Sequence, residues 1–214
     1  MKRIINELKQ ASQKHNIQHH NQLEWWCDYM LELFSTDGFL NGDIREHYNA
    51  MRVKNEDLFR ITLDWLVITD NQISKKKSID ILGTIYEKLY LTKNKAGSLG
   101  QFFTPTDVCE MIGKIIGENN NPTSTVNDCA CGSGRTLIAK HMMSESKKHY
   151  YIAEDVDPLM CKMCALNMMI HGMHGHVVCH DTLSNPDTFS TKYQINEVRY
   201  PIPTPYFSIR RITE

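Results

Sequence analysis

The sequence predicts an α/β fold in which an α-helical N-terminal domain precedes a partial parallel β-sheet. Before residue 99, apolar residues recur at helical spacing and no alternating strand pattern appears. After residue 99, short apolar runs alternate with helical patterns, which is typical of parallel strands joined by right-handed crossovers. The stretch 126–138 (VNDCACGSGRTLI) joins an apolar run, a glycine turn and a helical pattern. We therefore expect a helical domain at 1–98, a sheet domain at 99–183 and an irregular segment at 184–214.

Length and composition limit the kind of protein this can be. A chain of 214 residues can hold one core, or a small helical domain plus an incomplete larger one. With 24 basic against 25 acidic residues, any contact with DNA has to come from local basic patches. The seven cysteines are odd in number and unevenly spaced, as expected of reduced thiols in the cytoplasm. No apolar run reaches the roughly 18 residues of a membrane span.

Four helical patterns make up the N-terminal domain. They cover residues 1–14, 23–34, 56–69 and 78–91. Trp25, Trp26 and Trp65 stand at helical spacing with other apolar residues, so we expect core residues rather than platforms for nucleic-acid bases. The run at 75–77 is all lysine; it is either a phosphate contact or a solvated loop, and charge runs are more often the latter.

The region from 99 to 183 contains one opening helix, two strand–helix units and a third strand. Thr104 is expected to cap the opening helix, with Pro105 at its first position. One apolar face of this helix is predicted from Val108, Met111, Ile112 and Ile115. The expected strands are 125–130, 150–154 and 176–181, each in an apolar segment bounded by polar or turn residues.

Each predicted strand leads to an aspartate, namely Asp128, Asp155 or Asp181. The carboxyl ends of parallel strands meet at one edge of a sheet, where ligands collect. Asp155 lies where a nucleoside ribose presents its hydroxyls, or it caps the next helix, a role that suits Asp157 better. Asp181 either accepts from an adenine amine or ends its strand in a turn. Together with the glycine turn, these acids favour a nucleoside-type cofactor.

Five motifs occur in an order and spacing that resemble a known family. They are GQFFTP at 100–105, DCACGSG at 128–134, AEDVDP at 153–158, ALNMMIHG at 165–172 and HDTL at 180–183. In this respect the chain is similar to the N6-adenine DNA methyltransferases, particularly the modification subunit of type I restriction systems. The resemblance covers about residues 79–183. It implies a Rossmann-like class I methyltransferase core, as a partial parallel sheet.

The resemblance also implies a cofactor, its binding residues and partners. The cofactor is S-adenosyl-L-methionine, with the FFTP segment at its methionine end, Asp155 at the ribose and Asp181 at the adenine amine. Possible partners are DNA and a specificity or other subunit of a restriction–modification system. The implied cofactor-binding residues are Gln101, Phe102, Phe103, Thr104, Asp128, Ala130, Gly132, Gly134, Asp155 and Asp181.

The chain departs from the family pattern in three places. Cys129 replaces a usual proline and Arg135 a common glycine, and we expect both to matter little. The catalytic (N/D)PP(Y/F) motif, which holds a flipped adenine, is missing. The stretch 185–189 comes too early, and 204–207 (TPYF) has threonine for the asparagine and one proline in register. No catalytic residue is therefore assigned.

These observations predict a DNA adenine N6-methyltransferase-like protein that binds S-adenosylmethionine but is catalytically incomplete on its own. The alternative is a non-enzymatic interaction subunit or decoy of a restriction–modification system. A small-molecule or RNA methyltransferase is less consistent with the FFTP segment. A zinc site at Cys161 and Cys164 is disfavoured, because these thiols lie on an apolar helix and no second ligand pair follows at zinc-site spacing.

Overall fold

The computed structural model of the chain describes residues 1–36, 44–91, 103–117, 124–145, 148–184, 187–197 and 208–213. Helices fill the N-terminal part, as predicted. They are α1 (Lys2–Lys14), η1 (His19–Asn21), α2 (Gln22–Leu33), α4 (Ile44–Lys54), α5 (Glu56–Ile73) and α6 (Ile81–Tyr90). Helix α4 was not predicted from the sequence, because it buries only Met51 and so has little apolar periodicity. No helix among the described residues is long and apolar enough to cross a membrane.

Two tryptophans hold the helical layer together. Trp26 and Trp65 are fully buried, and their rings meet edge to face with centroids 6.5 Å apart. Trp26 Nε1 donates to Thr62 Oγ1 at 3.0 Å, which satisfies the indole in the core. Trp25 packs partly buried against the same core. The tryptophans are therefore core residues, as expected.

The sheet has five strands in the order β1-β2-β3-β4-β5. They are β1 (Thr125–Asp128), β2 (Tyr150–Asp155), β3 (His174–Cys179), β4 (Thr191–Ile195) and β5 (Ile209–Ile212). The first three strands are parallel, which confirms the predicted α/β fold with a partial parallel sheet. Helices α9 (Arg135–Met143) and α10 (Pro158–Ile170) connect them.

The last two strands correct the expectation of an irregular segment at 184–214. β4 runs antiparallel to β3, and β5 antiparallel to β4. Tyr193 and Ile195 alternate into the core, a pattern too short to stand out among the neighbouring prolines. After β4 the backbone turns at Asn196, whose φ is 55° and whose amide donates to the carbonyls of Met169 and Met173.

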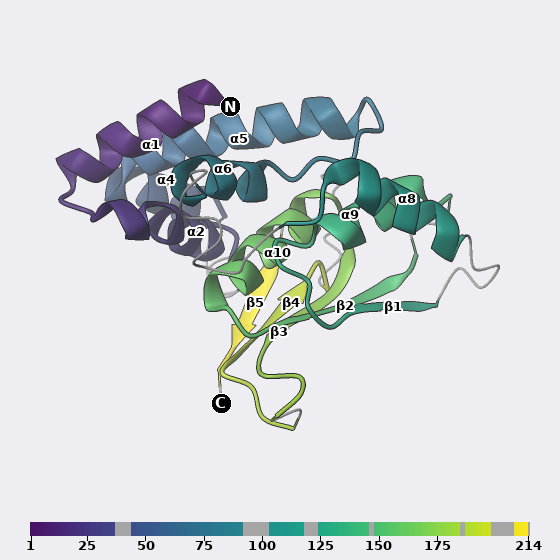
Figure 1. Cartoon of the computed structure of the whole chain (residues 1–214). Helices are drawn as coiled ribbons and strands as arrows, with labels where there is room; N and C mark the ends of the chain where they lie inside the picture. The colour runs from purple at the N-terminus through teal and green to yellow at the C-terminus, as the bar shows by residue number, and fades with distance from the viewer. Residues whose placement is uncertain are drawn as a thin grey trace.

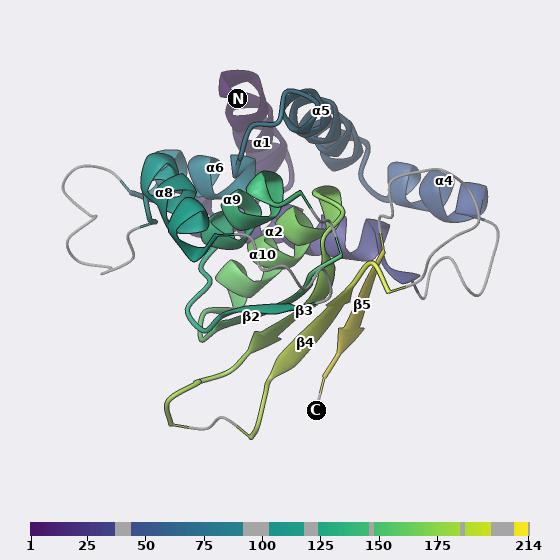
Figure 2. The same ribbon diagram turned by 90° about the vertical axis from the view of Figure 1, so that its right-hand side faces the viewer.

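All the described helices lie on one side of the sheet (Figures 1 and 2). Along β2, Tyr151 and Ala153 are buried beneath them, whereas Tyr150 and Ile152 on the other face are partly exposed. One core runs without a break from the helices into the sheet. A doubly wound sheet carries helices on both faces, and the described residues supply only one of these layers.

The opening helix α8 (Thr106–Ile116) differs from expectation at its start and in its packing face. Pro105 is its N-cap, and Thr104 makes no side-chain cap. The apolar face predicted for it points largely to solvent: Val108 is 38% exposed, Met111 53% and Ile115 75%. The reason is that α8 packs on α9 through its small residues, with Cys109 and Gly113 buried.

Candidate functional site

A cavity of about 170 Å³ lies at the carboxyl ends of β1, β2 and β3. Its walls include Ala130, Asp155 and Asp181, three of the residues predicted to bind the cofactor. They come from the loops that follow three successive strands. Cys129, Val156 and the residues around Thr182 complete the lining.

Asp155 connects this cavity to the glycine turn. Its Oδ2 accepts a hydrogen bond from the Gly132 N–H at 2.8 Å, and its Oδ1 accepts from the Asp157 N–H at 2.9 Å. Asp157 itself caps α10, its Oδ1 accepting from the Leu159 N–H at 2.8 Å, as expected. Since a carboxylate offers about four lone-pair positions, Asp155 can still accept from a ligand hydroxyl.

Asp128, at the end of β1, is a second acid near the strand ends, although it is not among the residues that line the cavity. The pKa of its carboxyl is raised, mainly because the group is buried. The hydrogen bond from the Ala130 N–H lowers this pKa, and the charge of the nearby Asp155 raises it. The hydrogen bond from the Ala130 N–H to Asp128 Oδ1 measures 3.3 Å. Because the charge of Asp155 acts on Asp128, the two acids together favour a positively charged group near them.

Asp181 ends its strand in a turn, which is one of the two roles that the sequence left open. Its Oδ1 accepts from the Leu183 and Ser184 N–H groups, both at 3.0 Å. Hydrogen bonds from Ser184, and then from the Leu183 N–H, hold the pKa of this exposed carboxyl low. Asp181 nevertheless lines the cavity, so a ligand role is compatible with the turn.

The two glycines of the turn are required by contacts within the chain. Gly132 has a φ of 53°, and a Cβ there would lie 3.3 Å from the Phe103 ring. Gly134 has a φ of 83°, and a Cβ there would lie 2.8 Å from Cys164 Sγ. Positive φ values and close neighbours both favour glycine. Phe103 and α10 therefore both lie close to the backbone of this turn.

Behind the turn lies a group of buried polar residues that sequence reasoning missed. We call Asp80, Ser133, Arg135 and Asn167 the Asp80 clasp. Asp80 is the N-cap of α6, its Oδ1 accepting from the Gly83 N–H at 2.7 Å and from Asn167 Nδ2 at 2.8 Å. Its Oδ2 accepts from Ser133 Oγ at 2.5 Å and from Arg135 Nε at 3.1 Å. The clasp ties the N-terminal helices to the middle of the glycine turn.

Arg135 extends the clasp to the FFTP segment. Its guanidinium lies 5.0 Å from the centroid of the Phe103 ring, and Nη1 donates to the Thr104 carbonyl at 3.2 Å. It also pairs with Glu87 at 3.3 Å. Arg135, which replaces a common glycine of the family, therefore makes several structural contacts, whereas this replacement was expected to matter little. The sequence contained one sign of the clasp: an aspartate stands just before the helical run ILGTIYEKLY, where a helix N-cap is expected.

Some predicted residues cannot be placed. Gln101, Phe102 and the TPYF stretch at 204–207 lie outside the described residues. Cys161 and Cys164, considered for zinc, are fully buried. In the described parts of the chain, no three metal-ligating side chains come together.

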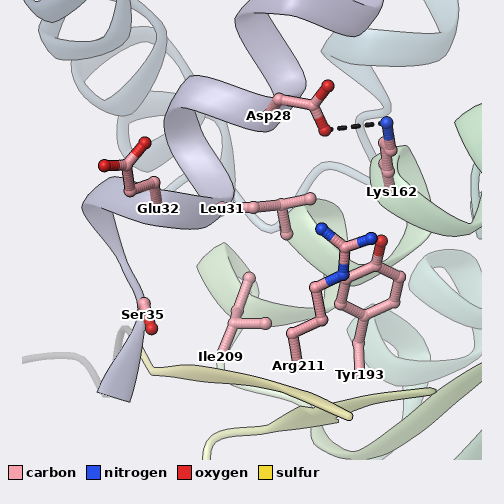
Figure 3. Close-up of a pocket in the computed structure, with 8 residues that line it drawn as sticks. All are labelled: Asp28, Leu31, Glu32, Ser35, Lys162, Tyr193, Ile209 and Arg211. Carbon is pink, nitrogen blue, oxygen red and sulfur yellow. Dashed lines mark ion pairs between the residues drawn. The ribbon is translucent and has the colours of Figure 1, made fainter. Parts of the chain in front are cut away.

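A larger cavity, about 480 Å³ in volume, lies elsewhere and shares no residue with the strand-end cavity. Figure 3 shows its lining from α2, α10, β4 and β5. Its acids are already paired: Asp28 with Lys162 at 2.7 Å, and Glu32 with Lys54 at 2.6 Å. Of the residues predicted from the sequence to bind the cofactor, Ala130, Asp155 and Asp181 line the smaller cavity, and none lines the larger one.

Comparison with known proteins identifies the family. Residues 77–210 match the N-6 DNA Methylase family, and the chain belongs to it. It is 30% identical over 123 residues to the type I restriction enzyme MpnII methylase subunit of Mycoplasma pneumoniae, covering 55% of this chain and 22% of that protein. It is 26% identical over 167 residues to the EcoEI methylase subunit of Escherichia coli, covering 71% and 32%.

A solved structure is also similar. It is the methyltransferase subunit of a type I restriction-modification system from Streptococcus thermophilus, with 18% identity and a TM-score of 0.40. The match covers 87% of this chain and 41% of that one. The chain therefore spans about a fifth to a third of the curated relatives and two fifths of the solved one.

Proposed function

We propose that the chain binds S-adenosylmethionine at the strand-end cavity and is a DNA adenine N6-methyltransferase-like protein that is catalytically incomplete on its own. One observation carries the proposal. Ala130, Asp155 and Asp181, which follow three successive strands, line a single cavity in a chain of the N-6 DNA Methylase family. The bound cofactor supplies an electrophilic methyl group; the residues of this chain bind and orient it.

The chemistry of the site suits this cofactor. Its ribose hydroxyls can donate to Asp155 and its adenine amine to Asp181, while its sulfonium is favoured by the acids Asp128 and Asp155. The cavity is smaller than the roughly 300 Å³ at the low end of small-molecule sites, so we assign it the adenosyl end.

The remaining assignments follow the family motifs. Asp128, Ala130, Gly132 and Gly134 form the cofactor turn. Gln101, Phe102, Phe103 and Thr104 contact the methionine end. The packing of Phe103 on Gly132, and the bond from Arg135 to the Thr104 carbonyl, support a shared site for the turn and the FFTP segment.

Two structural features support incompleteness. β1 pairs with β2 on one edge, and no described strand pairs with its other edge. Apolar side chains on α8 are exposed, with Ile115 75% and Ile116 60% accessible. An open strand edge and an uncovered apolar helix face are features of an interaction surface. We infer that another polypeptide of a restriction–modification system covers them, and that DNA contacts form in that assembly.

Calorimetric titration with S-adenosylmethionine tests cofactor binding. The native chain should bind, and Asp155→Asn, which keeps an acceptor for the Gly132 N–H, should bind about 10-fold to 100-fold more weakly because charge-assisted hydrogen bonds are lost. Asp187→Asn, at an exposed position outside the cavity, is the matched control and should bind like the native chain. Absence of binding by the native chain would refute the cofactor assignment.

A second measurement tests incompleteness. Labelled S-adenosylmethionine and adenine-containing DNA should give no methyl transfer with the chain alone, and transfer would contradict this part of the proposal. The alternative, a non-enzymatic interaction subunit or decoy, is favoured by the exposed face of α8. It becomes the better account if the native chain fails to bind the cofactor.

A further inference from the structure

The cavity of Figure 3, about 480 Å³ in volume, lies where α2 and α10 face β4 and β5. Next to it, the Ile209 N–H donates to the Phe34 carbonyl at 3.0 Å and joins the end of α2 to β5. The volume falls within the roughly 300–1,000 Å³ of small-molecule sites. The proposed function makes no use of this cavity, so its polar groups have to show what it can hold.

Hydrogen-bond donors from three elements converge on one side of the cavity. Tyr193 and Arg211 are register partners on β4 and β5, so their side chains leave the sheet on the same face. Figure 3 shows the two side by side, pointing from the sheet toward α2 and Lys162. The charges of Arg211 and Lys162 both act on the Tyr193 hydroxyl, and burial raises the pKa of Tyr193 to about 12. The hydroxyl therefore keeps its proton and can donate to a ligand.

Arg211 is the lining ion without a counter-charge. The other lining ions are paired, Asp28 with Lys162 and Glu32 with a lysine of α4. Lys162 also pairs with Glu24 at 2.8 Å. In the part of the chain that the structure describes, no carboxylate lies within ion-pair distance of Arg211, and the hydroxyl beside it has no hydrogen-bond partner. An exposed guanidinium and a free hydroxyl at one end of a cavity call for an anionic group.

The remaining walls limit the charge and the shape of that anion. Glu24, Asp28 and Glu32 follow one another at four-residue spacing on α2, and their charges disfavour a ligand with several negative charges. A guanidinium binds a planar carboxylate through two parallel hydrogen bonds. Leu31 and Ile209, which are 9% and 2% exposed, add apolar surface to the lining.

We propose that this cavity binds a small monocarboxylic acid, whose carboxylate accepts hydrogen bonds from Arg211 and Tyr193 and whose apolar body lies on Leu31 and Ile209. Lys162 uses two of its three N–H groups for Glu24 and Asp28, and the third remains for the ligand. Such a ligand would contact both the helical layer and the last two strands. The proposal goes beyond the proposed function and does not depend on cofactor binding.

The probe is 3-phenylpropionate, and 3-phenylpropionamide is its neutral match. In NMR titrations, the native chain should bind the acid about 10-fold to 100-fold more tightly than the amide, because hydrogen bonds to a charged group are lost with the amide. Saturable shifts should centre on the Arg211 side-chain Nε and on the backbone amides of Tyr193 and Ile209.

Two arginines of β5 provide a matched pair of variants. Arg211→Gln should abolish the preference for the acid over the amide. Arg210→Gln is the control, because Arg210 is also exposed but leaves the sheet on the opposite face, and it should bind the acid like the native chain. Tyr193→Phe should weaken binding of the acid about threefold to tenfold. If Tyr193→Phe does not fold, the arginine pair decides.

Other results would overturn the proposal. Equal binding of the acid and the amide, equal effects of the two arginine substitutions, or no saturable shift at Arg211 up to the solubility limit of the acid would each remove the site. If an oligodeoxyadenylate displaces the acid, the cavity takes a nucleic-acid phosphate. If a short peptide ending in a free phenylalanine carboxylate binds more tightly than the acid, the occupant is a polypeptide. The S-adenosylmethionine titration of the native chain judges the proposed function separately in every case.

Discussion

Asp80→Asn tests whether the Asp80 clasp joins the N-terminal helices to the glycine turn. The side chain of Asp80 is 1% exposed and its carboxylate accepts from four donors. Asparagine has the same shape, but its amide NH₂ group would replace one of the two accepting oxygens. That NH₂ group would then face N–H or O–H donors and could not accept a hydrogen bond from them. It also removes a charge partner of Arg135, whose side chain is 10% exposed.

The size of the effect follows from these contacts. Removing one partner of a buried ion pair costs about 3–5 kcal/mol. Glu87 still pairs with Arg135, so we expect the low end, about 3 kcal/mol. For a chain of this length, that loss lowers the melting temperature by about 6–12 °C.

Urea and thermal unfolding followed by circular dichroism measure this loss. Asp57→Asn is the matched control, because Asp57 is an acid of the same helical layer that pairs with Lys14 at the surface. The Asp57→Asn variant should lose about 1 kcal/mol of stability or less. If Asp80→Asn proves no more destabilising than Asp57→Asn, the clasp does not hold the two parts together.

Three further predictions concern single features. Gly134→Ala should destabilise the chain by about 1–3 kcal/mol in urea unfolding, because its φ is 83° and the new Cβ would meet Cys164 Sγ at 2.8 Å; an unchanged midpoint would contradict the packing described. His171 is held neutral with a pKa of about 4, so the unfolded chain binds more protons between pH 6.5 and 4. Stability should fall by about 3 kcal/mol as the pH drops through this window, and His171→Phe should flatten the fall. Leu137→Ala should cost about 2–5 kcal/mol, because Leu137 is 2% exposed, whereas Ile115→Lys on the open face of α8 should change stability by less than about 0.5 kcal/mol. Equal losses from these two variants would show that α8 is covered within the chain.

The features that follow local rules could be predicted from the sequence. Except for α4, the main helices and the three parallel strands show clear periodicity, and Asp155 and Asp181 reach one cavity because parallel strands align their ends. Asp157 caps α10 as its position before a proline suggested.

Features that depend on contacts between distant segments could not be predicted. Asp80 and Arg135 are 55 positions apart in sequence, and nothing local shows that they meet. The side on which α8 packs is set by the small residues Cys109 and Gly113, whereas its apolar periodicity pointed to the opposite face. β4 lies beside β3 as its antiparallel partner, which the short alternation of β4 did not reveal.

The central claim is that S-adenosylmethionine binds at the carboxyl ends of β1, β2 and β3. Its most direct test is a titration of the ¹⁵N-labelled native chain followed through its backbone amide resonances. Saturable shifts should centre on Ala130, Gly132, Asp155 and Asp181, with Val53 on α4 unmoved. The absence of shifts at these residues, or shifts centred on the α2–β5 cavity of Figure 3, would contradict the account.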